Sequence, residues 1–385
     1  EINGGKCNTE EDFYKACRAA SILGTLQAGY TDFKFLTDTS KLIFDREALL
    51  GVSITGWMNN PDILFNENIL EKGAKIVKEV NREVAQIIGI NSAARTTCVK
   101  PSGNASVLLQ TASGIHAEHS NMYIRNVQMN KESEITQAIM KTNPYMVEDS
   151  VWSAGGTDVV VSFPILPKKG SMYKDDLLGV KHLELVKKAQ KHWVEAGTNE
   201  DLCADKGVRH NVSNTIIVDD WDEVEKYVFE NRHSFAGISF LAMSGDKDYN
   251  QAPNTAVITA KDMVKKYGNA AVFASGMVVD ALKCFNNLWD ACSTAKGFGE
   301  DLSLESSENA MKRDWIRRFG KFSDNYLNSD TVLAEHCLKD AYLLHKWNKI
   351  QSTLKTVDWK EDIKERKYTD VDTLAAAACA GGACE

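Results

Sequence analysis

Alternation between strand-like and helix-like segments is the feature that most restricts how this chain can fold. Five short segments are rich in Val, Ile, Thr, Phe or Tyr, as β-strands are: 96–100, 123–129, 158–165, 211–218 and 237–243. Helical patterns separate most of them, at 131–142, 174–196 and 221–231. Because alternating strands and helices favour parallel pairing, the sequence predicts an α/β fold with five parallel strands. These strands form either an open sheet or half of a larger barrel.

Longer helical patterns flank this region. Apolar residues recur at helical spacing over 10–29 and 68–88, and Gly89 ends the second pattern. Residues 259–350 are mostly helical in pattern, and the chain ends in a small-residue, Gly-containing segment. We therefore predict three parts: residues 1–258 as the α/β unit, 259–358 as a helical region, and 359–385 as a flexible tail.

Composition excludes several classes of function. The formal net charge is −8 and no strongly basic patch occurs, which argues against binding to duplex nucleic acid. No apolar run approaches the ~18 residues of a membrane span, so no membrane partner is expected. The nine cysteines are an odd number in a long chain without a secretory signal. A reducing compartment fits this better than a disulfide framework, and we expect a cytoplasmic location.

Two cysteines at the extreme end are the most informative pair. Cys379 and Cys384 are separated by Ala-Gly-Gly-Ala, which lets the chain turn so that the sulfurs can meet. The segment from Arg366 to Cys379 reaches about 45 Å when fully extended. The pattern indicates a dithiol shuttle. A frayed end with incidental cysteines and half of a zinc site are the alternatives.

A possible phosphate-binding loop follows the first of the five predicted strands. Gly103 permits close approach of the backbone, and Ser102 and Ser106 supply hydroxyl donors. Backbone amides at such a turn can hold a phosphate where a helix begins. A strand-to-helix turn without a ligand is the alternative. The predicted phosphate-binding residues are Pro101, Ser102, Gly103, Asn104, Ala105 and Ser106.

His116 and His119 are spaced so that they could hold a metal on one helical face. We interpret them instead as polar loop residues, and no metal site is predicted. Five other cysteines lie in apolar or mixed surroundings and are interpreted as small buried side chains. They are Cys98, Cys203, Cys284, Cys292 and Cys337.

An ordered set of short blocks resembles the monomeric class II, adenosylcobalamin-dependent branch of the ribonucleotide reductases. Residues 1–8 resemble the segment after the Asn-Pro-Cys-x-Glu loop, and 100–106 resemble the Lys-Pro-Ser-Gly-Thr phosphate loop, with Asn104 in place of Thr. Further blocks follow in the family's order at 123–125, 159–164, 210–215, 236–239 and 249–253. The terminal Cys-x4-Cys matches the family's tail, so the resemblance spans almost the whole chain.

The resemblance implies a fold, a reaction and roles for residues. The family folds as a ten-stranded α/β barrel, of which this chain would be the second five-stranded half. It converts ribonucleoside triphosphates to 2′-deoxyribonucleotides by thiyl-radical chemistry, with adenosylcobalamin as cofactor. Glu1 would be the carboxylate base, and Cys7 one of the pair oxidised in each turnover. Cys379 and Cys384 would reduce that pair, and a thioredoxin-like protein would reset the tail.

The resemblance also implies that the chain begins just after the loop with the radical cysteine. The N-terminal part of the same reductase is then an expected partner, and the chain alone should be inactive. One alternative is a fragment of a class I large subunit, against which the Lys-Pro-Ser-Gly loop argues. The other is a non-catalytic half that acts only by complementing an N-terminal polypeptide.

Overall fold

The computed structural model describes residues 1–243, 251–268 and 331–359. The chain divides into two units, and each is described by itself. Unit 1 comprises residues 1–121 and 167–245, and unit 2 comprises 122–166 and 246–385. The boundaries predicted at 258 and 358 stay predictions.

A parallel sheet forms the centre of unit 1. Strand β2 (Val52–Thr55) lies between β1 (Ile2–Asn3) and β3 (Thr97–Cys98), and both neighbours run parallel to it. All four residues of β2 are buried. Burial on both faces is typical of a parallel sheet that is covered by helices.

Two further strands extend this direction. A single parallel bridge joins Val99, just after β3, to Val212. Val99 donates its amide to the Asn211 carbonyl at 3.1 Å and accepts from the Ser213 amide at 2.8 Å. Beyond this bridge, β7 (Thr215–Val218) pairs in parallel with β8 (Ser239–Ala242). Within the described residues, unit 1 therefore contains five strands with parallel partners: a three-stranded sheet β1-β2-β3 and a pair β7-β8, linked by the single bridge between Val99 and Val212.

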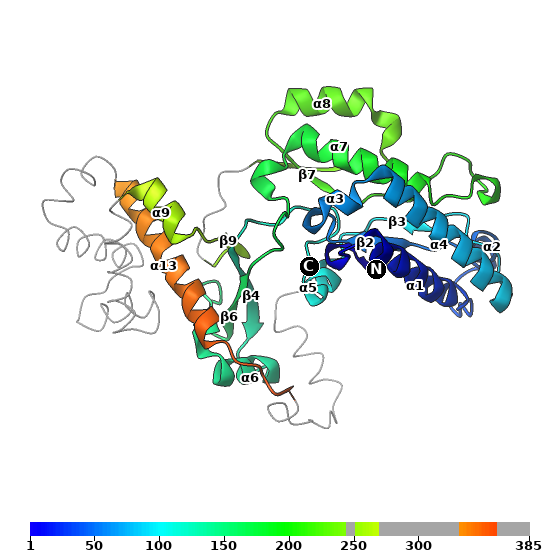
Figure 1. Ribbon diagram of the computed structural model, residues 1–385. Helices are drawn as coiled ribbons and strands as arrows, with labels where there is room; N and C mark the ends of the chain where they lie inside the picture. Colours follow the sequence, from blue (N-terminus) through cyan, green and yellow to red (C-terminus); the bar gives the residue numbers. More distant parts are fainter. Residues whose placement is uncertain (244–250, 269–330, 360–385) are drawn as a thin grey trace, which may run out of the picture. The chain divides into compact units, whose positions relative to one another are not determined.

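Helices α1 (Glu10–Ala28) and α4 (Glu67–Ile88) lie side by side against this sheet (Figure 1). A capping box starts α1, because Thr9 and Asp12 each accept a hydrogen bond from the other's backbone amide. Asn66 caps α4 by accepting from the Ile69 amide, and Gly89 ends α4 in the left-handed conformation. These local signals explain where both helices begin and where α4 ends.

Buried aromatic side chains fill the core of unit 1 where α1 packs against α4. Phe13 and Trp193 are fully buried, with ring centroids 5.9 Å apart. Gly73 on α4 faces Phe13, and a Cβ at this position would lie 2.6 Å from the Phe13 ring. The two helices therefore pack more closely than any larger side chain would allow.

The remaining elements of unit 1 surround the sheet or connect its strands. The α-helices are α2 (Asp38–Glu47), α3 (Pro61–Leu64), α5 (Gly103–Leu109), α7 (Gly179–Ala189) and α8 (Trp221–Glu230). The short helices are η1 (Gly4–Lys6), η2 (Trp57–Asn59), η4 (Lys174–Asp176), η5 (Gln190–Glu195), η6 (Glu200–Leu202) and η7 (Arg232–Ser234). Among these, η5 is a π-helix that directly continues α7.

Unit 2 is built on an antiparallel sheet. Its strands lie in the order β5 (Val147–Asp149), β6 (Asp158–Ile165), β4 (Tyr123–Asn130) and β9 (Asn254–Ala256). Its described helices are α6 (Glu134–Thr142), η3 (Pro144–Met146), α9 (Ala260–Tyr267) and α13 (Thr331–Thr353).

Polar contacts and a small apolar cluster attach α13 to this sheet. Lys346 forms a buried ion pair with Glu148 of β5, with 2.7 Å between Nζ and Oε1. Ile350 packs with Val159 and Val161 of β6 in a small buried cluster. Asn143 exchanges two hydrogen bonds with the backbone of Lys355, just beyond the helix. The C-terminal half of α13 is thereby fixed to unit 2.

The prediction of five parallel strands needs one correction. The predicted strands at 123–129 and 158–165 exist, but they pair antiparallel with each other, in register from Tyr123↔Ile165 to Asn130↔Asp158. Exposed Val127 and Gln128 show that β4 is not covered on both faces, as a parallel strand would be. The short strands β1 and β2 were not predicted, and they supply the two missing parallel strands.

The other predicted strands and the helices at 10–29, 68–88, 131–142, 174–196 and 221–231 are confirmed to within a few residues. Of the predicted helical stretch 259–350, α9 and most of α13 are described, and 269–330 lies outside the described residues. No helix in the described parts of the chain is long and apolar enough to cross a membrane.

Gly73 offers a test of the α1–α4 packing. Gly73→Ala should gain about 1 kcal/mol of helix propensity but lose about 1–3 kcal/mol, because Phe13 cannot move away in a filled core. We expect a net loss in the free energy of unfolding, measured by urea denaturation. Lys75→Ala, on the exposed side of α4, is the control and should change little. A stabilised Gly73→Ala variant would contradict the packing described here.

Candidate active site

Ser53 joins the predicted base to the predicted phosphate loop. Its hydroxyl donates to Glu1 Oε1 at 3.3 Å and accepts from the backbone amide of Lys100 at 2.9 Å. Ser53 is 3% exposed and pairs with Cys98 in the parallel sheet. The register of β1, β2 and β3 therefore brings Glu1 and the start of the loop to the same level of the sheet.

The loop after β3 presents unbonded amides at the start of a helix. Helix α5 begins at Gly103, and the preceding Ser102 has a left-handed backbone with φ 55°. Gly103, Asn104 and Ala105 are exposed, and within the described residues their amides have no hydrogen-bond acceptor. Three neighbouring amides at a helix start can bind a phosphate oxygen. The left-handed residue aims them outward, at a cost in backbone strain.

Ser106 supports this loop from inside. It is 2% exposed, its amide donates to the Ser102 carbonyl, and its hydroxyl donates to the Gly103 carbonyl at 2.9 Å. The hydroxyl is therefore already engaged within the loop. Within the described residues, the exposed amides of residues 103–105 are the loop donors left unbonded, and the phosphate-binding role of the loop stays a prediction.

A second segment returns alongside the loop. The Ser113 hydroxyl donates to the Pro101 carbonyl. Gly114 has φ +51°, and a Cβ there would lie 2.6 Å from the Lys100 carbonyl oxygen. Glycine is thus required at 114 both for its backbone conformation and for this close approach.

Asn59 connects the returning segment to other parts of unit 1. Its Oδ1 accepts from the Thr111 hydroxyl at 2.7 Å and from the Ala112 amide at 2.6 Å. Its Nδ2 donates to Glu118 Oε1 at 2.7 Å and to the Ser171 hydroxyl at 3.0 Å. All four bonds of one buried amide are used, which fixes the loop relative to η2.

Cys7 lies just beyond η1 and is 5% exposed. Its Sγ lies 3.5 Å from the Asn3 carbonyl oxygen. Burial raises the pKa of Cys7 to about 11, the nearby Asp12 carboxylate raises it further, and Lys168 opposes this effect. At neutral pH the sulfur is therefore a protonated thiol, which is the form that can give up a hydrogen atom.

Cys98 is buried as predicted, and the structure also places it within the electrostatic influence of Glu1. Burial and then the negative charge of Glu1 raise its pKa to about 11. Cys98 therefore lies in the electrostatic neighbourhood of Glu1, on the strand next to Ser53. Among the other cysteines interpreted as buried, Cys203 and Cys337 are buried, and Cys284 and Cys292 lie outside the described residues.

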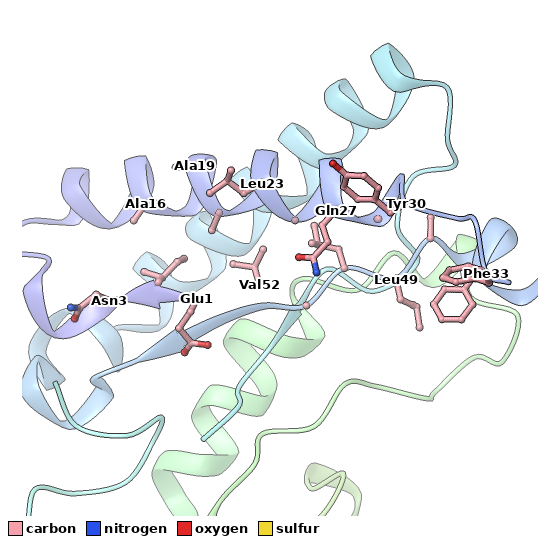
Figure 2. Close-up of a pocket in the computed structure, with 18 residues that line it drawn as sticks. Glu1, Asn3, Ala16, Ala19, Leu23, Gln27, Tyr30, Phe33, Leu49 and Val52 are labelled. Carbon is pink, nitrogen blue, oxygen red and sulfur yellow. The ribbon is translucent and has the colours of Figure 1, made fainter. Parts of the chain in front are cut away.

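A pocket of about 790 Å³ lies beside Glu1, along the edge of β1. Figure 2 shows Asn3 and Glu1 toward one end and Leu49 and Phe33 toward the other, with Ala16, Ala19 and Leu23 of α1 along one wall. Most of its lining residues are apolar, and polar atoms, including those of Glu1, Asn3, Gln27 and Tyr30, supply about half of its surface.

His116 is held as a neutral ring by two backbone contacts. Its Nε2 accepts from the Thr215 amide at 3.0 Å, so its Nδ1 carries the hydrogen and donates to the Ser113 carbonyl. Burial lowers its pKa. His182 packs edge-on against it and donates from Nε2 to the Ile115 carbonyl at 2.9 Å. No cluster of metal-ligating side chains occurs among the described residues.

The structure joins some of the predicted site residues and leaves others apart. Glu1 and the phosphate loop meet through Ser53, and Asn3 Nδ2 ties the Cys7 side of β1 to the end of α5 through the Leu109 carbonyl at 2.9 Å. Within the described residues, no hydrogen bond joins Cys7 directly to Glu1. Cys379 and Cys384 lie outside the described residues.

Sequence reasoning missed Ser53, Asn59 and Asn60. The signal available for them was a cluster of polar residues inside and just after a short buried strand, Val-Ser-Ile-Thr-Gly-Trp-Met-Asn-Asn. Polar side chains that are buried with every bond satisfied often hold a site in shape. This signal is visible only once β2 is recognised as a buried strand, because polar residues are common in surface loops.

Comparison with known proteins supports the resemblance seen in the sequence. A probable adenosylcobalamin-dependent ribonucleoside-triphosphate reductase of Dictyostelium discoideum is 28% identical over 191 residues, which are 48% of this chain and 24% of the relative. An adenosylcobalamin-dependent ribonucleoside-triphosphate reductase of Euglena gracilis is 24% identical over 224 residues, 57% of this chain and 28% of the relative. The chain thus spans about a quarter of the length of these relatives. No protein-family model matches it.

A crystal structure of a B12-dependent, class II ribonucleotide reductase superposes with a TM-score of 0.54 at 17% identity. The match covers 66% of this chain and 36% of that structure. It confirms a mixed helix and sheet fold like that of class II reductases, and a complete ten-stranded barrel stays a prediction.

Asn104→Asp tests the phosphate loop. The new carboxylate lies in the first turn of α5, where it suits the helix dipole, but it should repel a bound phosphate. We expect the affinity for inorganic tripolyphosphate to fall about tenfold, measured from amide chemical shifts at 103–105. Gln110→Glu adds the same charge at the other end of α5 and should have a smaller effect. Equal losses in the two variants would count against a phosphate site at these amides.

The buried histidine pair predicts sensitivity to acid. Burial lowers the pKa of His182 to about 4, whereas an unfolded histidine titrates near 6.5. The stabilising contribution of neutral His182 is complete above pH ~6.5 and is lost as the pH falls toward ~4, by up to about 1.4 kcal/mol per pH unit. His182→Gln can still donate to Ile115 and should flatten this loss in urea denaturation between these limits. His233→Gln, at an exposed position, should leave the slope unchanged, and an unchanged slope in His182→Gln would contradict the assignment.

Proposed function

We propose that this chain is part of an adenosylcobalamin-dependent reductase that converts ribonucleoside triphosphates to 2′-deoxyribonucleotides. The observation that carries the proposal is the Glu1–Ser53–Lys100 connection, which sets a carboxylate beside a helix start with unbonded amides. The relatives carry this activity in their names. Those names also favour the cobalamin-dependent branch over a class I large subunit.

The loop at 101–106 would hold the substrate's phosphates. The three exposed amides of residues 103–105 donate to phosphate oxygens, and the start of α5 adds a favourable dipole. Pro101 and Ser102 shape the turn that leads into these amides. Asn104, which stands where the family usually has Thr, can donate from its side chain.

Glu1 would take the proton from the ribose 3′-hydroxyl. Ser53 donates to Oε1, and within the described residues the second oxygen has no hydrogen-bond partner. A carboxylate fixed through one oxygen and free at the other is suited to accept a proton from a bound hydroxyl. Because Ser53 also accepts from Lys100, the base and the phosphate loop keep a fixed separation during binding.

Cys7 would supply reducing equivalents with a second cysteine elsewhere in the reductase. The buried, protonated thiol is protected from loss of its proton to water and from unwanted oxidation. After a turnover the pair would form a disulfide. Cys379 and Cys384 would reduce it by thiol exchange, and a thioredoxin-like protein would then reduce the tail.

The rest of the reductase would pack against the edge of β1. Among the described residues β1 pairs only with β2, so its other edge is available to a further strand beside the pocket. A further strand and helix would cover both features. This N-terminal part would bring the radical-bearing cysteine. A cytoplasmic location, in which thiols stay reduced, stays a prediction.

Adenosylcobalamin would start the radical chemistry, which no protein side chain can begin alone. The described residues do not by themselves make a site for the whole cofactor. The N-terminal part of the reductase would complete this site.

Reconstitution with the N-terminal part of the reductase tests this function. The chain alone should form no deoxynucleotide, and the combined protein should form it when adenosylcobalamin is present. Replacing both Cys379 and Cys384 by Ser should leave the first turnover intact, because the Cys7 pair is already reduced. Continued turnover with thioredoxin should fail, and dithiothreitol should partly restore it, since a small dithiol can diffuse to the site.

Cys7→Ser is the matched variant, and it should damage the first turnover itself. Product formation by the chain alone would overturn the proposal that it needs the N-terminal part. Full thioredoxin-driven turnover by the double tail variant would show that the tail is not the shuttle. A combined protein that binds nucleotide but never forms product would favour a non-catalytic, complementing role.

A further inference from the structure

The turn that carries Cys7 is held from outside by two side chains. Asn60 donates from Nδ2 to the carbonyls of Gly4 at 3.1 Å and Cys7 at 2.6 Å. Lys168 donates from Nζ to the carbonyl of Gly5 at 3.2 Å. Three carbonyls in a stretch of four residues are thus bonded by side chains from two distant segments.

The segment that carries Lys168 is itself fixed to the same place. The Lys168 carbonyl accepts from both the hydroxyl and the amide of Ser171, at 2.7 and 3.1 Å. The Ser171 hydroxyl in turn accepts from Asn59 Nδ2, and the Met172 amide donates to the Met58 carbonyl at 2.8 Å. The backbone at Lys168 is therefore anchored to η2, directly before Asn60. The long Lys168 side chain starts from a rigid base although it is itself exposed.

Charges around Cys7 oppose each other. Asp12 in the first turn of α1 disfavours the thiolate, and Lys168 favours it. Cys17, farther along α1, is buried, interacts electrostatically with Cys7, and is a neutral thiol. Lys168, bonded to the Gly5 carbonyl of the same turn, thus supplies a positive charge that acts on a sulfur which burial and Asp12 keep protonated.

We propose that Lys168 is a positioning residue for Cys7, which holds the Gly4–Cys7 turn and stabilises negative charge on the sulfur during thiol exchange. This rests on the redox role proposed above for Cys7. When a tail thiolate attacks the partner sulfur of a Cys7 disulfide, a new S–S bond forms and the old one breaks. Cys7 leaves with the electron pair as a thiolate, and a nearby ammonium lowers the cost of that charge.

Two alkylating reagents of different charge give a direct test in the chain itself. Iodoacetate is an anion and iodoacetamide is neutral, and both react with the same thiolate. The ratio of their rate constants at Cys7, measured by mass spectrometry of the Cys7 peptide, therefore reports the local potential. The fraction of thiolate and the exposure of Cys7 change both rate constants by the same factor, so they cancel in the ratio. A structural change without a change in local charge would therefore leave the ratio unaltered.

Lys168→Gln keeps a hydrogen-bond donor but removes the charge. We expect it to lower the iodoacetate-to-iodoacetamide ratio about two- to fivefold, because the positive charge that attracts the anionic reagent is lost. Lys168→Arg should keep the ratio of the unaltered chain. Lys169→Gln removes the same charge from the next, equally exposed residue and should leave the ratio nearly unchanged.

An unchanged ratio in Lys168→Gln, or an equal drop in Lys169→Gln, would overturn the inference. If Lys168→Gln does not fold, Lys168→Met and Lys168→Arg supply the same comparison of lost and retained charge. The result is independent of turnover. If Cys7→Ser left reconstituted turnover intact, the redox role of Cys7 would fall, while a lowered ratio would still establish Lys168 as the cation beside that sulfur.

Discussion

The parallel register of β1, β2 and β3 is the constraint on which the candidate site depends. It aligns Glu1 with Ser53 and Ser53 with Cys98, one residue level across three strands. A shift of one residue in β2 would turn Ser53 to the other face of the sheet and break both of its hydrogen bonds. Helices α1 and α4 cover one face of this sheet, and the glycine at position 73 lets them pack closely there. This packing helps to keep the register of the strands.

Around this row, buried amides hold the loops to which we assign the chemistry. Asn59 fixes the segment that returns beside the phosphate loop, and Asn60 fixes the turn that ends at Cys7. Both residues belong to one short turn after β2. The side chains of both residues form several hydrogen bonds within the protein, which hold the loops in place before a ligand binds. A preformed site loses less entropy on binding its substrate.

The sequence predicted much of this arrangement through local signals. Long helices such as α1 and α4 were found because their apolar spacing and end signals agree, and the loop at 101–106 was found because glycine and serine follow a strand. Strand direction was not predictable in the same way, since β6 is as rich in Val and Ile as a parallel strand is. In β4, the polar residues Asn126, Gln128 and Asn130 at alternate positions were the available sign of an antiparallel sheet. The two-residue strand β1 is too short for any pattern, and Ser53 gained its role only through tertiary pairing.

A crystal structure of the chain bound to a ribonucleoside triphosphate would test the central claim most directly. The account predicts phosphate oxygens within hydrogen-bond distance of the amides of residues 103–105, with the ribose 3′-hydroxyl directed toward Glu1 and the Ser53 bonds intact. Phosphates bound elsewhere in unit 1, or a Glu1 carboxylate turned away from Ser53 and the ribose, would contradict it.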